Sequence, residues 1–255
     1  MQRILKQVPQ AESLASLLGL EGNLAALYFG ALPQLLSEGS APEFQFSGRN
    51  RRPPKDRFNA LLSFGYALLL KDVMNAILVV GLEPALGFYH QPRTQAPPLA
   101  LDLMEIFRVP VVDLAVMGSI NRGQWDGKED FDVRGDQVWL SDSGRRKFIG
   151  LYERRKEESW KHPVLGYSLT YRRLIELEVR LLEKEWMGEG GLFDCWGVRS
   201  LCRENSGLQS SGDMDSGART TPNFLMQGSA SVYSCLAYSS PLATTQTGFE
   251  GLESR

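Results

Sequence analysis

Apolar residues recur at spacings of three and four along the first two-thirds of the chain, a pattern typical of helices that bury one face. A first helix is expected over Leu14–Leu35 and a second over Phe58–Val80. A third is expected over Leu99–Met117, bent near Pro110, because proline lacks the N–H that a helix interior needs. Two more helices are expected over Ser143–Ser159 and Pro163–Trp186, the latter with proline at a tolerated first position.

The strand signal is much weaker than the helix signal. Phe131–Val133 and Val138–Leu140 flank a segment with Gly135 and Asp136 at its centre, which predicts a β-hairpin. The predicted fold is therefore mainly α: a multi-helix domain with one short hairpin.

Composition divides the chain into two regions. Residues 1–187 form the predicted helical domain, whereas from Gly188 onward there is no lysine and Ser, Gly and Thr become dense. Such a segment buries little apolar surface, so residues 188–255 are predicted to be a disordered or non-native tail. The three cysteines, Cys195, Cys202 and Cys235, all lie in this tail without the paired spacing of a zinc site.

Charge and hydropathy indicate a soluble protein. No apolar segment of a secretory signal follows Arg3 and Lys6, and Lys71 and Asp72 interrupt the longest apolar stretch. We therefore expect a cytoplasmic protein without a membrane span. The formal net charge of −2 gives no general support for nucleic-acid binding, so the placement of basic residues has to be considered.

Candidate chemistry is concentrated at four polar residues in apolar surroundings. His90 ends the string Gly-Phe-Tyr-His, and Asp102 and Glu105 follow at a spacing that places both carboxylates on one helix face. Glu21 interrupts another apolar run, with Gly19 and Gly22 on its two sides. A buried carboxylate without a partner is costly, which favours a cation or a histidine beside these acids. Taken singly, these signals favour a satisfied histidine and a solvated helix face over a metal site.

Four motifs occur in one order along residues 10–187. They are Gly-Leu-Glu-Gly-Asn-Leu-Ala-Ala-Leu-Tyr-Phe from Gly19, Asn-Ala-Leu-Leu-Ser-Phe-Gly-Tyr from Asn59, Gly-Phe-Tyr-His from Gly87, and Asp-Leu-Met-Glu from Asp102. This ordered set resembles the universal CRISPR-associated integrase that inserts new spacers. The resemblance implies a metal-dependent DNA endonuclease and integrase that joins spacer DNA to a CRISPR array by phosphodiester transesterification.

The resemblance also implies a metal site. Glu21, His90 and Glu105 would be the catalytic ligands of a divalent ion, and Asp102 would either ligate it or orient His90. Two or three carboxylates with one imidazole suit Mn²⁺ or Mg²⁺. The ion would stabilise charge on the phosphodiester while a DNA 3′-hydroxyl or a water attacks. We expect Mn²⁺ to work best.

A basic cluster precedes the second predicted helix and is expected to bind DNA phosphates. Polar positions on that helix, by the resemblance, line the cleft. The predicted DNA-binding residues are Arg49, Arg51, Arg52, Lys55, Arg57, Asn59, Ser63 and Tyr66. A second basic group, from Arg145 to Lys156, is explained equally well by ion pairs along a helix.

The sequence also departs from the family pattern. The family's N-terminal β-rich domain, which builds the homodimer, is missing before residue 1, and the resemblance stops near Trp186. We therefore expect a truncated or frame-shifted product in which the homodimer and its complex with the small CRISPR-associated partner dimer are impaired. The alternatives are a catalytically silent DNA-binding or assembly module with the same fold, and an enzyme acting on small phosphoesters, although no phosphate-binding glycine loop is present.

Overall fold

The computed structural model describes residues 2–40, 42–50, 53–91, 97–161, 166–189 and 193. Two short helical turns, α1 (Gln2–Leu5) and η1 (Val8–Gln10), precede α2 (Leu14–Ala31) and its extension η2 (Leu32–Leu35). Ser13 begins α2 by accepting a hydrogen bond from the Ser16 N–H at 3.2 Å. The first predicted helix is thus confirmed, with its last turn tightened at Pro33. The predicted tail, residues 188–255, lies outside the described residues apart from Gly188, Glu189 and Phe193.

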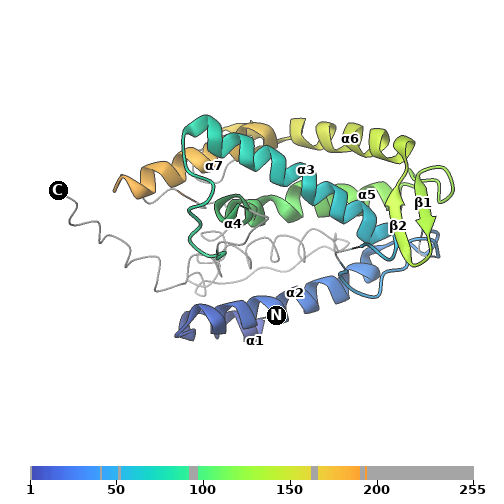
Figure 1. Cartoon of the computed structure of the whole chain (residues 1–255), viewed down its shortest axis with the longest axis horizontal. Coiled ribbons are helices and arrows are strands. Elements are labelled where there is room, and N and C mark those ends of the chain that lie inside the picture. Colours follow the sequence, from blue (N-terminus) through green and yellow to red (C-terminus); the bar gives the residue numbers. More distant parts are fainter. Residues whose placement is uncertain are drawn as a thin grey trace, which may run out of the picture.

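The central element is α3 (Arg57–Val80), which is confirmed almost to the residue. Asp56 caps its start by accepting from the Asn59 N–H at 2.7 Å, and Gly81 ends it with a left-handed φ of 94°. The helix contacts α4, η3 and α7. Figure 1 shows α2 along one side of the molecule and α6 and α7 along the other, with α3, α4 and α5 between them.

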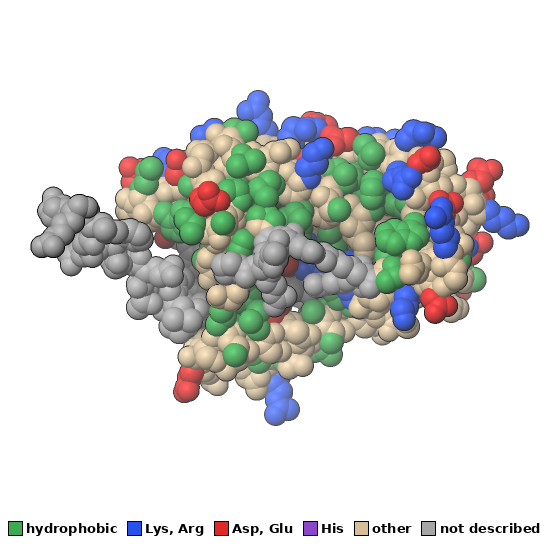
Figure 2. Space-filling model, viewed as in Figure 1, with side chains coloured by type: hydrophobic (Ala, Val, Ile, Leu, Met, Phe, Trp, Pro, Cys, Tyr) green, Lys and Arg blue, Asp and Glu red, His purple; other side chains and the backbone are tan. Residues whose placement is uncertain are grey.

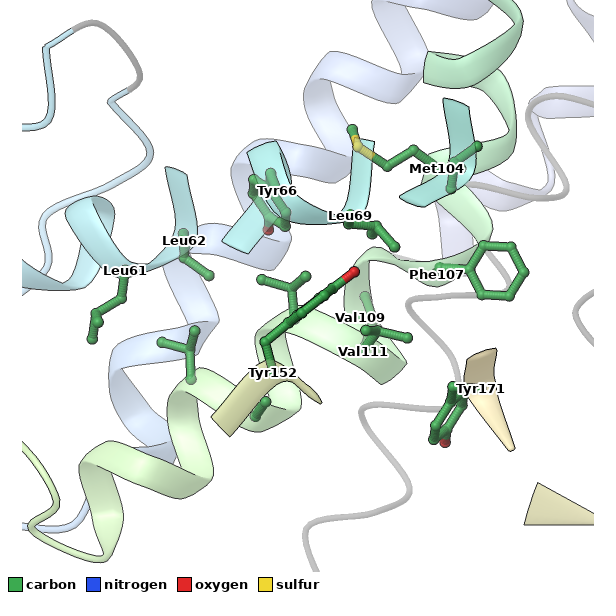
Figure 3. Close-up of a cluster of buried hydrophobic side chains, with 14 of the residues drawn as sticks. Leu61, Leu62, Tyr66, Leu69, Met104, Phe107, Val109, Val111, Tyr152 and Tyr171 are labelled. Atoms are coloured by element: carbon green, nitrogen blue, oxygen red, sulfur yellow. The ribbon is translucent and has the colours of Figure 1, made fainter. Parts of the chain in front are cut away.

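The third predicted helix is divided into three parts. These are α4 (Pro98–Phe107), the π-helical segment η3 (Arg108–Asp113) and α5 (Leu114–Asn121). Pro110, where a bend was predicted, lies in the π-helical segment, whose turns are wider than those of an α-helix. All of η3 is buried, and Figure 3 draws Val109 and Val111 of this segment in one cluster with residues of α3 and α6.

The predicted hairpin is confirmed as β1 (Phe131–Arg134) and β2 (Gln137–Leu140), an antiparallel pair in which Phe131 faces Leu140. Gly135 occupies the turn with φ 58°, a conformation that favours glycine. Next comes α6 (Asp142–Glu157), within two residues of its predicted limits. Figure 2 shows Lys and Arg side chains along the edge that α6 and this hairpin form.

The start of the last helix was predicted wrongly. α7 spans Tyr171–Trp186 and is capped by Thr170, so it begins eight residues after Pro163. A second antiparallel pair, β3 (Ser159–Lys161) and β4 (Ser168–Thr170), is also present. β4 lies within the segment that had been assigned to the last helix, and β3 overlaps the preceding predicted helix at Ser159 alone. With three residues a strand, this pair is too short to produce a periodic signal.

Two helices are long and apolar enough to span a membrane by length and composition alone, Leu14–Leu35 and Arg57–Val80. The sequence analysis had expected no segment of sufficient length and apolar character, and these two helices meet that criterion. Core helices of globular proteins meet the same criterion. In α3, Phe58, Leu62 and Val73 are fully buried against other elements. Lys156 of α6 also pairs with Asp72 of α3 at 2.6 Å. Both features are those of a core helix.

Candidate functional site

Glu21, His90, Asp102 and Glu105 come together from three parts of the chain: α2, the loop after α3, and α4. Tyr89 connects the loop to α2. It packs with Leu17 and Leu24 in a small second core, and its hydroxyl donates to Glu21 Oε2 at 2.8 Å. Burial of the Tyr89 ring thereby fixes the position of the Glu21 carboxylate.

Asp102 organises the loop that carries His90. Its Oδ2 accepts from the backbone N–H groups of Phe88 and Tyr89 at 2.7 and 3.0 Å. Its Oδ1 accepts from the His90 backbone N–H at 2.8 Å and from His90 Nδ1 at 2.6 Å. Since a carboxylate only accepts, Nδ1 is the donor, and Nε2 is the ring nitrogen left to face a ligand.

Gly87 lets the loop approach α4 closely enough for these bonds. A Cβ at this position would lie 2.5 Å from Pro98 Cβ and 2.9 Å from Asp102 Oδ2. The glycine of the Gly-Phe-Tyr-His motif is therefore required by contact with Pro98 and Asp102.

Glu105 is held by an arginine that the sequence analysis did not select. One guanidinium nitrogen of Arg108 donates to both Glu105 oxygens, at 2.7 and 2.8 Å, and both side chains are buried. A carboxylate has about four lone-pair positions, so this pair leaves coordination capacity on Glu105.

The electrostatics show that Glu21, His90 and Glu105 influence one another. Burial raises the pKa of Glu21, the Tyr89 hydrogen bond opposes this, and the charge of Glu105 raises the pKa further. Burial alone would lower the pKa of His90, but the Asp102 hydrogen bond and charge, with the charges of Glu105 and Glu21, raise it above 6.5. Negative charge thus accumulates around the imidazole.

Among the described residues, no three His, Cys, Asp or Glu side chains are close enough to form a ready-made metal cluster. The donor types nevertheless fit a divalent ion: two carboxylates, and an imidazole whose other nitrogen is held by a carboxylate. Glu21, His90 and Glu105 would supply the ligand atoms. Asp102 already accepts four hydrogen bonds, which favours the orienting role over that of a ligand.

The predicted DNA-binding residues fall into different environments. Arg49 forms one group, donating to Asn59 Oδ1 at 2.7 Å and to Ser63 Oγ at 3.1 Å, with its guanidinium carbon 5.4 Å from the Tyr66 ring centroid. Asn59 is fully buried and also donates to Asp56. Tyr66 is buried and donates to Asp113 at 2.5 Å. The polar atoms of Asn59 and Tyr66 are therefore engaged inside the protein.

Lys55 and Arg57 differ in exposure. Lys55 is exposed and lines an open cavity of about 460 Å³ between η2 and the loop that precedes α3. Arg57 instead joins two loops by donating to the Gly127 and Glu43 carbonyl oxygens, and it lies 5.8 Å from the Phe131 ring centroid. Arg51 and Arg52 lie outside the described residues.

Two buried residues near Glu105 were missed, Arg108 and Asp113. Asp113 accepts from the Tyr28 hydroxyl at 2.7 Å as well as from Tyr66. The signal that singled out Asp102 and Glu105 was available here too, because both charges interrupt the apolar run from Ile106 to Met117.

A family model described as CRISPR associated protein Cas1 matches residues 1–154. A curated relative from Myxococcus xanthus, a CRISPR-associated exonuclease Cas4/endonuclease Cas1 fusion, is 56% identical over 199 residues. The match covers 78% of this chain and 35% of that protein, so the chain spans about a third of the relative's length.

Solved structures agree with this match. A Cas1 protein from Thermotoga maritima has a TM-score of 0.66 and 32% identity, over 74% of this chain and 58% of that one. A casposase bound to integration product has a TM-score of 0.64 and 29% identity, over 72% and 51%. A chain of a Cas6-RT-Cas1–Cas2 complex has a TM-score of 0.64 and 29% identity, over 74% and 20%. The chain belongs to the CRISPR-associated Cas1 family.

Proposed function

We propose that this chain provides the catalytic helical domain of a metal-dependent DNA endonuclease and integrase that inserts spacer DNA into a CRISPR array by phosphodiester transesterification. The observation that carries the proposal is the junction of Glu21, the His90 loop and Glu105, with Asp102 fixing the imidazole through Nδ1 at 2.6 Å. Family membership and the similarity to a casposase bound to integration product support DNA as substrate.

The chain's own residues perform three tasks in this proposal. Glu21 and Glu105 provide carboxylate oxygens, and Asp102 directs the proton-free Nε2 of His90 toward them. A bound Mn²⁺ or Mg²⁺ ion supplies charge stabilisation at the phosphodiester and at the attacking oxygen. Burial of Asp102 and Glu105 limits motion of the site and strengthens these electrostatic effects.

The proposed partners are spacer and repeat DNA, a second copy of the chain, and Cas2, the small partner dimer. One similar structure is a complex of Cas1 with Cas2, which supports the last of these. Arg49 and Lys55 are proposed to contact DNA phosphates. For Arg49 this requires its guanidinium to bind a phosphate while it remains beside Asn59 and Ser63.

The test measures Mn²⁺-dependent strand transfer and nicking on branched DNA with the full chain. Glu21→Ala and His90→Ala should each reduce the rate at least about a hundredfold, because each removes a ligand. The matched controls are Glu12→Ala, which alters an exposed acid in the same part of the chain, and His162→Ala, which removes the second histidine. Activity that persists in both ligand variants would refute the site.

The second candidate function is a catalytically silent DNA-binding or assembly module. The tight pairing of Glu105 with Arg108 is the observation that favours it, since that pair competes with metal binding. A folded wild-type chain that binds DNA but neither binds Mn²⁺ nor cleaves would support this alternative.

A further inference from the structure

The π-helical segment η3 carries a buried charge at each end, Arg108 and Asp113, which are 5% and 1% exposed. In an α-helix, with about 3.6 residues per turn, positions five residues apart point in clearly different directions. A π turn closes its hydrogen bond over five residues, which brings such positions onto nearly the same face. The segment thereby directs Arg108 and Asp113 to one side chain, Tyr66 of α3.

The contacts with Tyr66 are short on both sides. The Arg108 guanidinium carbon lies 4.5 Å from the Tyr66 ring centroid, and the Tyr66 hydroxyl donates to Asp113 Oδ1 at 2.5 Å. Tyr28 of α2 donates to the other oxygen, Asp113 Oδ2, at 2.7 Å. Asp113 therefore fixes the orientation of a ring against which the Arg108 guanidinium packs.

Contacts with the neighbouring helices α6 and α3 hold the π-helical segment η3 in place. Pro110 lacks an N–H and disrupts the ordinary helical pattern, and its carbonyl oxygen accepts from Arg155 Nε of α6 at 2.7 Å. On the other side, Val112 packs closely against Gly65 of α3. The relative positions of Arg108 and Asp113 are thus fixed by α3 and α6.

We propose that Asp113 is a positioning residue for Glu105, acting through Tyr66 and Arg108. Asp113 orients the Tyr66 ring, the ring supports the Arg108 guanidinium, and that guanidinium holds both Glu105 oxygens. Replacing the Asp113 carboxylate removes one of the two acceptors for the tyrosine hydroxyls, so Tyr66 and then Arg108 lose their fixed positions. The proposal deepens the proposed function and rests on it, because Glu105 matters here as a metal ligand.

The test is the Mn²⁺ affinity of the full, metal-free chain measured by isothermal titration calorimetry with Mn²⁺ alone. Asp113→Asn should weaken Mn²⁺ binding about tenfold, the lower end of the effect typical for residues that support metal ligands. Tyr66→Phe, which removes only the hydroxyl, should weaken it by a similar factor. The double variant should bind Mn²⁺ no more weakly than either single variant, because both changes interrupt the same series of contacts from Asp113 to Glu105.

Asp130→Asn is the matched control. Asp130 is equally buried at 2%, pairs with Lys147 at 2.5 Å, and caps the loop before β1, so its loss costs stability without touching the site. Its Mn²⁺ affinity should stay within about twofold of wild type. Circular dichroism establishes that each variant folds, and if Asp113→Asn does not fold, Tyr66→Phe decides the matter.

The outcomes separate the two proposals. If the wild type binds Mn²⁺ and both Asp113→Asn and Tyr66→Phe bind as tightly as Asp130→Asn, Asp113 does not position Glu105. If the folded wild type does not bind Mn²⁺, the proposed function fails at the metal site itself.

Discussion

At the scale of single residues, Asp102 determines the properties of His90. Its side chain is fully buried, whereas that of His90 is 26% exposed. The raised pKa of His90 means that the metal-free protein keeps the imidazolium to a pH above 6.5. The ion pair therefore stabilises the fold fully below the unfolded-state value near 6.5, and this contribution is lost as pH rises through the folded-state value.

Asp102→Asn should lower the pKa of His90, because burial then acts without the opposing charge. We expect the midpoint of the His90 titration to move to a lower pH. The measurement is an imidazole ¹⁵N NMR titration of the metal-free chain, with His162→Ala used to assign the two histidines. An unchanged His90 titration would show that Asp102 does not control the imidazole.

In the proposed metal site, protonation of His90 should make Mn²⁺ binding depend on pH. Because a protonated imidazole cannot ligate, Mn²⁺ must displace the His90 proton below its pKa. The apparent affinity for Mn²⁺ should therefore fall as pH is lowered through that value.

At this scale the sequence singled out polar residues that lie near one another in the fold. Glu21, His90 and Asp102 stood out as polar residues in apolar surroundings, and the structure brings them together. The sequence did not reveal their hydrogen bonds. Tyr89 has the pattern of an ordinary core aromatic residue, yet its hydroxyl donates to the Glu21 carboxylate and fixes its position. Which polar groups meet depends on tertiary packing, and the spacing of residues along one helix contains no such information.

At the scale of elements, α3 and η3 approach unusually closely at Gly65. A Cβ there would lie 2.5 Å from Val112 Cγ1 and 2.8 Å from Phe148 Cζ. Glycine is otherwise unfavourable inside a helix. Contact between α3, η3 and α6 therefore accounts for this residue.

Gly65→Ala should destabilise the protein by about 1–3 kcal/mol, because the added methyl overpacks a filled core. Gly150→Ala is the matched control: its Cβ would meet nothing within 4 Å, and it lies on an exposed part of α6. That change should stabilise by about 0.5–1 kcal/mol through helix propensity. Urea unfolding of both variants measures the difference, and equal effects of the same sign would contradict the close-packing explanation.

Two features of the helices could not be predicted from the sequence: the form of the segment around Pro110 and the start of α7. Pro110 predicted that the helix is irregular at this point, but the π-helical form of the segment, with its contact to Arg155 of α6, could not be inferred from the proline. The start of α7 at Tyr171 could not be inferred from apolar spacing, because β4 directly precedes it and Thr170 provides the cap. Local patterns identify helices more reliably than they identify where helices begin.

At the scale of the whole molecule, the candidate site depends on the tertiary fold. Its proposed ligands come from α2, the loop after α3, and α4, and the proposed effect of Asp113 on Glu105 passes through α3 and η3. Within the described part of the chain, no single helix or strand holds all of these residues. Metal binding and folding should therefore be thermodynamically linked, as is usual for sites assembled from distant segments.

Two basic residues at the start of α3, Lys55 and Arg57, have different surroundings in the folded molecule. Lys55 is exposed, whereas Arg57 joins the loops at Glu43 and Gly127. Lys55→Ala should weaken DNA binding and reduce the slope of log affinity against log salt by about 0.7 to 0.9, the value for one lost phosphate contact. Arg57→Ala should instead lower the midpoint of thermal unfolding, because it leaves two loops unconnected.

Fluorescence anisotropy at several salt concentrations and thermal unfolding, applied to both variants, separate these roles. The matched control is Lys128→Ala, an exposed lysine outside the cluster, which should change neither the salt slope nor the midpoint. If Arg57→Ala lowered the salt slope by the same amount as Lys55→Ala and left the unfolding midpoint unchanged, Arg57 would be a phosphate contact as the sequence predicted. The loop contacts of its guanidinium make the opposite result the expected one, since a charge held by two carbonyl oxygens and an aromatic ring is less available to DNA.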